Sequence, residues 1–160
     1  MTKNKLEKIF SKSLQSDIEL WFMKLHNNPL AHQTTPADYI LSYQQSIFPP
    51  NLQLHLVECK QVTCCDGKGR FAFKRLKQMY DLIQFEEKVF HFHNGWLCLA
   101  YYDRTWANSE VYLIPIKVMQ KVIHDSSYVS INREDAKERF KNFKLFVLPG
   151  SILDLALLKS

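Results

Sequence analysis

The sequence predicts an α/β fold in which a central β-sheet is flanked by helices. Two stretches, residues 3–25 and 73–85, repeat apolar side chains at about 100° per residue, which is typical of amphipathic helices. Several short apolar runs bounded by Pro, Asn or Gly lie between and after them and are typical of strands. The apolar arc of the first helix consists of Leu6, Phe10, Leu14, Ile18, Trp21 and Leu25.

The composition limits the class of protein. The 160 residues are 46% hydrophobic and 13% aromatic, which fits one folded domain spanning residues 1–160 and argues against disorder. A net charge of +5 favours a polyanionic partner, although a mild basic excess is common. No stretch approaches the roughly 20 apolar residues of a membrane helix, and the lysine-rich start precedes an amphipathic pattern. We therefore expect a cytoplasmic protein that binds no membrane.

The remaining elements follow from alternation and turn residues. Strands are expected at 39–43 and 52–60, joined by a turn at 48–51 into a hairpin. A loop at 62–70 leads into the helix at 73–85. Further strands are expected at 89–93, 95–102, 110–116 and 145–148, with a helix at 132–140 and an apolar segment at 152–158 that seals the core or a dimer contact.

An acid and a lysine two residues apart, Glu58 and Lys60, end the strand at 52–60. Strand side chains alternate, so both project from the face that Leu52, Leu54 and Leu56 occupy. Charges that continue a buried stripe are costly unless a metal, partner or substrate compensates, so the pair is a functional candidate. The hairpin would bring Asp38, at the start of the partner strand, beside this pair.

Two further signals are ambiguous. Glu7 falls within the apolar arc of the first helix, where it either reaches solvent at a frayed helix start or lies beside a metal. A zinc site could be assembled from Cys59, Cys64, Cys65, His91 and His93, but their spacing matches no standard ligand pattern. We expect Cys59 and Cys98 to be small core residues instead.

Asp38, then Glu58-x-Lys60, then a helix bearing Gln78, together resemble the PD-(D/E)xK nuclease superfamily. Within it, the chain looks most like the RecU-type Holliday junction resolvases. The segments that carry the resemblance, within residues 1–125, are TTPADYI, LVECKQ, LKQMYDL and EVYLIP. The resemblance implies a restriction-endonuclease-like core, with a central mixed β-sheet flanked by helices. It also implies a strand before Asp38, where the sequence shows no convincing one.

The function implied is that of a Mg²⁺-dependent endodeoxyribonuclease that makes paired symmetric nicks in four-way junctions during recombination or repair. Mg²⁺, which Mn²⁺ can replace, would be held by Asp38, Glu58 and the main-chain carbonyl of Cys59, with Glu7 positioning a metal-bound water. Lys60 would orient or deprotonate the attacking water. A symmetric junction has two equivalent strands to cut, so a homodimer is expected.

The same resemblance assigns the DNA contacts. Gln78 and Lys74 would hold the backbone near the cut, and the full set of basic contacts would be Lys68, Arg70, Lys74, Arg75 and Lys77. Two alternatives stay open: another repair or restriction-type nuclease of this superfamily, and a non-catalytic nucleic-acid-binding module of the same fold. Each residue also has a simpler explanation, since Asp38 could be a turn residue, Glu58 and Lys60 an ordinary salt bridge, and the lysines a solvated helix face.

Overall fold

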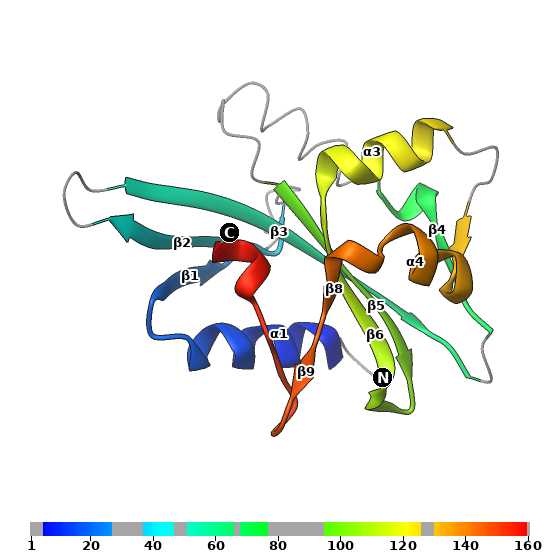
Figure 1. Cartoon of the computed structure of the whole chain (residues 1–160), viewed down its shortest axis with the longest axis horizontal. Coiled ribbons are helices and arrows are strands. Elements are labelled where there is room, and N and C mark those ends of the chain that lie inside the picture. The colour runs from blue at the N-terminus through cyan, green and yellow to red at the C-terminus, as the bar shows by residue number, and fades with distance from the viewer. Residues whose placement is uncertain are drawn as a thin grey trace.

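A six-stranded mixed sheet runs through the centre of the structure in the order β1-β2-β3-β5-β6-β8 (Figure 1). This computed structural model describes residues 5–26, 37–46, 51–65, 68–76, 95–125 and 130–159, with the backbone alone at 44–46, 51–53, 75–76 and 125. Strands β3 and β5 are parallel, and the other neighbouring strands are antiparallel. The strands are β1 Leu20–Lys24, β2 Tyr39–Ser46, β3 Asn51–Thr63, β5 Gly95–Asp103, β6 Thr105–Pro115 and β8 Lys144–Leu145.

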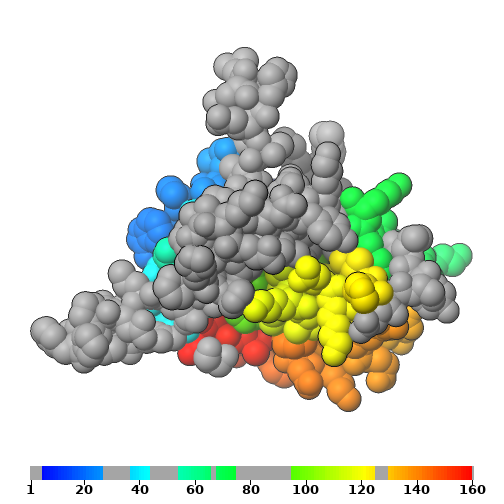
Figure 2. All heavy atoms as spheres, turned by 90° about the horizontal axis from the view of Figure 1, so that it is seen from above, coloured from blue at the N-terminus to red at the C-terminus, as the bar shows by residue number. Residues whose placement is uncertain are grey.

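Helices cover both faces of this sheet. Helix α1 (Lys5–Ser16) packs on one face, and α3 (Ile116–Asp125) and α4 (Arg133–Arg139) pack on the other, where Figure 2 shows them side by side in yellow and orange. Among the described residues, no helix has the length and apolar character needed to cross a membrane. The smaller elements are β4 Arg70–Ala72, η2 Phe73–Leu76, β7 Ser130–Asn132, η3 Lys141–Phe143, β9 Val147–Leu148, β10 Ile152–Leu153 and η4 Ala156–Lys159.

Strand β3 supplies side chains to two hydrophobic clusters, one on each face of the sheet. Leu56 and Val62 belong to the cluster beneath α3 and α4, while Val57 and Cys59 belong to the cluster beneath α1. Because strand side chains alternate, Glu58 lies on the same side as Leu56 and Val62, and it is only 2% exposed. The predicted buried stripe is confirmed at Leu56 but is wrong at Leu54, which is 38% exposed.

The helix predicted at 3–25 is wrong beyond residue 16. Asp17 ends α1 in a turn, because its carbonyl accepts from Leu20 N (3.2 Å) and its Oδ1 accepts from Glu19 N (3.1 Å). The chain then enters β1, which pairs with β2 along its whole length. Ile18 is consequently 99% exposed and Trp21 57% exposed instead of lying in a helical core stripe. Strand pairing outweighs the helical periodicity here because aromatic residues favour strands.

Most other predicted elements are present with shifted ends. The hairpin of β2 and β3 is confirmed, as are the strands β5 and β6 and the helix α4, whose N-cap Asn132 accepts from Asp135 N (2.8 Å). Helix α3 is not predicted by the sequence pattern. The strand expected at 145–148 is wrong, since Leu145 ends β8 and residues 147–148 pair with β10 in a separate two-stranded sheet. Residues 77–94, including the predicted strand at 89–93, lie outside the described residues.

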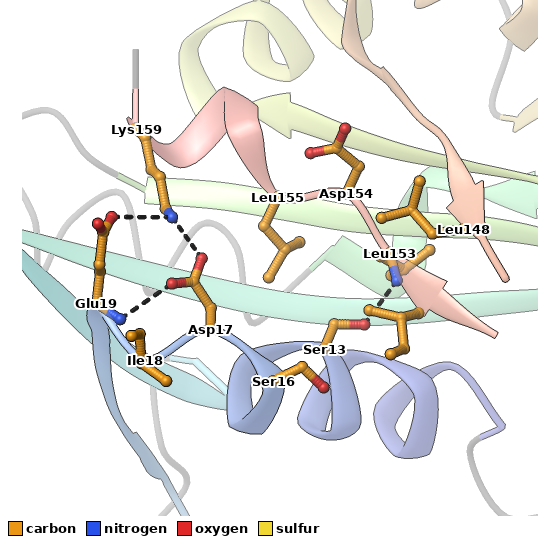
Figure 3. Close-up of a pocket in the computed structure, with 11 residues that line it drawn as sticks. Ser13, Ser16, Asp17, Ile18, Glu19, Leu148, Leu153, Asp154, Leu155 and Lys159 are labelled. Carbon is orange, nitrogen blue, oxygen red and sulfur yellow. Dashed lines mark hydrogen bonds and ion pairs between the residues drawn. The ribbon is translucent and has the colours of Figure 1, made fainter. Parts of the chain in front are cut away.

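The C-terminal segment packs across α1, as expected for a segment that seals the core. Leu153, Leu155 and Leu158 are buried in the α1 cluster. Figure 3 shows the polar contacts that fasten it: Leu153 N donates to Ser13 Oγ (2.8 Å), and Lys159 Nζ lies 2.6 Å from Asp17 Oδ2. These contacts tie the end of α1 to the end of the chain and leave an open cavity of about 450 Å³ between them.

Candidate active site

Asp38 lies between β1 and β3 at the start of β2. Its backbone N–H donates to Val57 O (3.0 Å), and its carbonyl accepts from Leu25 N (2.7 Å). Tyr39 pairs with Val57, so continuing the register by one residue sets Asp38 opposite Glu58. The Oδ2 atom of Asp38 accepts from the backbone N–H of Cys59 at 2.7 Å. The carboxylate of Asp38 is thus fixed against the segment that carries Glu58 and Lys60.

Glu58 and Lys60 form an ion pair on the face of β3 that carries Leu56 and Val62. Lys60 Nζ lies 2.8 Å from Glu58 Oε1, and the two side chains are 18% and 3% exposed. Removing two charges from water at this depth costs free energy that their mutual attraction rarely recovers. A contribution to stability alone therefore does not explain this pair. The strand alternation expected from the sequence therefore gives the predicted juxtaposition of the acid, the lysine and Asp38.

The carboxylates at this position repel one another. Burial, followed by the charge of Asp38, raises the pKa of Glu58 to about 7, although Lys60 acts against this rise. Burial also raises the pKa of Asp38, with the charge of Glu7 adding to the effect and the hydrogen bond from Cys59 N opposing it. Ionising both groups is costly in the absence of a further positive charge. The site is therefore suited to receiving a cation.

Glu7, in the first turn of α1, belongs to the same electrostatic cluster. Its Oε2 lies 2.7 Å from Lys24 Nζ, and its side chain is 15% exposed, so it does not extend into solvent. The hydroxyl of Tyr39 donates to the carbonyl of Glu7 (3.2 Å) and is bonded to Ser11 Oγ (2.6 Å). The residue that follows Asp38 therefore holds the first turn of α1 beside the sheet.

The donor set fits Mg²⁺ better than a metal that needs a complete protein cage. No group of three or more His, Cys, Asp or Glu side chains in the described ranges is arranged to hold a metal ion. Mg²⁺ commonly uses one or two carboxylates and fills its other positions with waters and substrate phosphates. The carboxylates of Asp38 and Glu58, with the carbonyl of Cys59, match that requirement, whereas the buried thiol of Cys59 faces the opposite cluster.

The remaining predicted site residues are not brought into this cluster by any interaction that the structure describes. Lys68 and Lys74 are exposed, and Arg70 in β4 donates from Nε to Ser130 Oγ (2.9 Å) on β7. Lys77 and Gln78 lie outside the described residues, as do His91 and His93, and the side chain of Arg75 is not described. Cys59 and Cys98 are buried core residues, as predicted.

The sequence pattern does not predict two sets of ion pairs, that of Lys24 with Glu7 and those of Arg133. Lys24 falls within a predicted helix, so nothing indicates that it meets Glu7. Arg133 at the start of α4 forms ion pairs with Glu110 (Nε to Oε2, 2.5 Å) and Asp103 (Nη1 to Oδ2, 2.8 Å). Arg133 is 23 residues from Glu110 and 30 residues from Asp103, and the three residues follow no motif. Their network fastens α4 to β5 and β6, and we assign it a structural role.

Two open cavities in the described part of the chain lie away from the candidate site. The cavity in Figure 3 and a second one of about 640 Å³, between the β5–β6 turn and residues 144–151, are lined by none of Glu7, Asp38, Glu58 and Lys60. The chain matches no protein-family model and has no significant match among curated proteins.

Proposed function

We propose that this chain is a metal-dependent DNA endonuclease of the PD-(D/E)xK type, most similar to the RecU-type Holliday junction resolvases. The observation that carries the proposal is the register of β2 and β3, which sets Asp38 opposite the buried Glu58–Lys60 pair. Strand β1, which precedes Asp38, supports the proposal because the resemblance implies a strand there, although the sequence pattern predicts helix over these residues. The central mixed sheet with helices on both faces is also what the resemblance implies.

The roles of the residues follow from their chemistry. Asp38, Glu58 and the Cys59 carbonyl would hold Mg²⁺, which supplies Lewis acidity toward the phosphate and lowers the pKa of water. The backbone N–H of Cys59 orients Asp38 by bonding its Oδ2 atom. Lys60 orients the attacking water and offsets negative charge that develops on the phosphate. Its ion pair with Glu58 keeps the ammonium in place before DNA binds.

The basic residues after β3 would bind the DNA backbone outside the reaction centre. Lys68, Arg70 and Lys74 lie on consecutive segments that follow β3, and all three are exposed. Phosphate contacts of this kind set affinity and its dependence on salt without reading sequence. Paired cuts on a symmetric junction would require two copies of the chain related by a twofold axis.

A panel of labelled DNAs tests this proposal. The wild-type chain with Mg²⁺ should nick a four-way junction at symmetric positions on two opposing strands, and Asp38→Asn should abolish the nicks. Preferential cutting of flap, three-way or linear DNA would instead identify another nuclease of the superfamily. Binding without cleavage by both proteins, in Mg²⁺ and in Mn²⁺, would identify a non-catalytic binding module and would overturn the proposal.

A further inference from the structure

A second acid–lysine pair lies near Asp38, on the face of the sheet that α1 covers. Glu7 on α1 and Lys24 on β1 approach to 2.7 Å, compared with 2.8 Å for Glu58 and Lys60. The two pairs come from three different elements, and Asp38 interacts electrostatically with all four charges. In particular, Glu7 raises the pKa of Asp38, whereas Lys24 and Lys60 lower it.

The placement of Lys24 is fixed by the fold. Lys24 pairs with Tyr39 in the β1–β2 register, and its Nζ lies 5.9 Å from the centre of the Tyr39 ring. The same tyrosine binds the carbonyl of Glu7 through its hydroxyl. Tyr39 therefore contacts both members of the pair, and the residue that follows β1, Leu25, donates to the carbonyl of Asp38. An ammonium is thereby held at the edge of the carboxylate cluster.

We propose that Lys24 is a positioning residue of the nuclease site, which holds Glu7 toward Asp38 and sets the net charge of the site. With Glu7, Asp38 and Glu58 ionised and both lysines protonated, the cluster carries one net negative charge. One divalent cation would convert this to one net positive charge, which complements the single negative charge of a phosphodiester. This inference rests on the proposed function, because it assigns Lys24 to the same site.

The charge of Lys24 should act in opposite directions on the two ligands. Lys24 repels a cation that binds the carboxylates, and it attracts the phosphate of DNA. A residue that only fastened β1 to α1 would behave differently, because its removal would loosen the carboxylates and weaken the binding of both ligands. The two roles therefore predict opposite changes in metal affinity.

Lys24→Gln separates these roles, since an amide can still donate to Glu7 without carrying charge. We expect this variant to bind Mn²⁺ alone about 2- to 5-fold more tightly than wild type, measured by the electron paramagnetic resonance signal of the free ion. With Ca²⁺ in place of Mg²⁺, it should bind a four-way junction about 2- to 5-fold more weakly. The pair is partly solvated, so larger effects are not expected.

Three matched variants complete the experiment. Lys24→Arg should stay within about twofold of wild type in both measurements, and so should Lys121→Gln, which removes an exposed charge on α3. Glu7→Gln should weaken Mn²⁺ binding. Unchanged or weaker Mn²⁺ binding by Lys24→Gln, with wild-type binding intact, would overturn the role of Lys24 alone. Absence of Mn²⁺ binding by the wild-type chain would overturn the proposed nuclease site and this inference together.

Discussion

The ammonium of Lys60 lies 2.8 Å from Oε1 of Glu58, and the side chain of Glu58 is only 3% exposed. The two residues are neighbours on one face of β3, with Asp38 opposite at the start of β2. A shift of one residue in the register of β3 would turn Glu58 and Lys60 to the opposite face of the sheet, away from Asp38. The proposed chemistry therefore depends on the β2–β3 register.

Lys60→Gln should lower the turnover rate of junction cleavage by about 10²- to 10⁴-fold, the usual range when a proton-transfer or charge-stabilising group is removed. The glutamine amide can still donate to Glu58, so the variant should remain folded and should bind junction DNA within about threefold of wild type. Single-turnover cleavage and a binding titration in Ca²⁺ measure the two effects. Lys141→Gln, at an exposed position in η3, is the matched control and should cut normally. Normal cutting by Lys60→Gln would remove Lys60 from the mechanism.

Glu58 should make the metal-free protein less stable as the pH rises. Its pKa is raised from 4.5 to about 7 in the fold, so the folded chain holds a proton that the unfolded chain releases within this range. The free energy of unfolding should therefore fall between pH 4.5 and pH 7, by on the order of 2 kcal/mol from this group. Urea unfolding in EDTA at several pH values should show this fall in wild type relative to Glu58→Gln. Parallel curves for the two proteins would contradict the prediction.

His55 should contribute the opposite pH dependence over an overlapping pH interval. It is 2% exposed, and its Nδ1 accepts from Trp96 Nε1 (2.9 Å), a bond that only the neutral ring can accept. Burial lowers its pKa from 6.5 to about 4. Its contribution to stability is therefore complete above pH 6.5 and disappears as the pH falls toward 4. The difference in unfolding free energy between wild type and His55→Gln should therefore increase with pH over this interval. A difference that does not change with pH would show that His55 is not held neutral.

Lys68 and Lys74 should contribute to DNA affinity mainly by neutralising phosphates. Replacing both with alanine should reduce the slope of log affinity against log salt by about 0.9 for each phosphate on a duplex arm that is no longer neutralised. The cleavage pattern at saturating enzyme should not change, because both residues are placed outside the reaction centre. Fluorescence anisotropy across a salt series measures the slope. The double variant Lys117→Ala, Lys141→Ala removes the same charge elsewhere and should leave the slope unchanged; equal slopes for all three proteins would refute the assignment.

The sequence predicts the relative placement of Asp38, Glu58 and Lys60 better than it predicts the elements around them. Glu58, Lys60 and Asp38 can be placed together because strand alternation and a hairpin are local rules that depend on few residues. The helix predicted over residues 17–25 is wrong because Ile18, Trp21 and Leu25 continue a helical spacing, while the strand partners that decide their structure lie about twenty residues away. Helix α3 is not predicted, although Ile116 and Met119 are buried in the cluster beneath it.

Ion pairs between residues that are distant in sequence could not be predicted either. Lys24 meets Glu7 only because β1 exists, and Arg133 meets Glu110 only because α4 packs on β6. Such pairs depend on tertiary placement and have no spacing signal in the sequence. The carboxylates of the candidate metal site differ in this respect, since Asp38 and Glu58 lie on adjacent strands joined by one hairpin.

Anomalous scattering from a crystal grown with Mn²⁺ and a phosphodiester-containing oligonucleotide would locate the metal ion. We predict a Mn²⁺ peak in contact with the carboxylates of Asp38 and Glu58, with a phosphate oxygen bound to the same ion. A peak at the cysteines or histidines instead, or none between Asp38 and Glu58 while DNA is bound, would contradict this prediction.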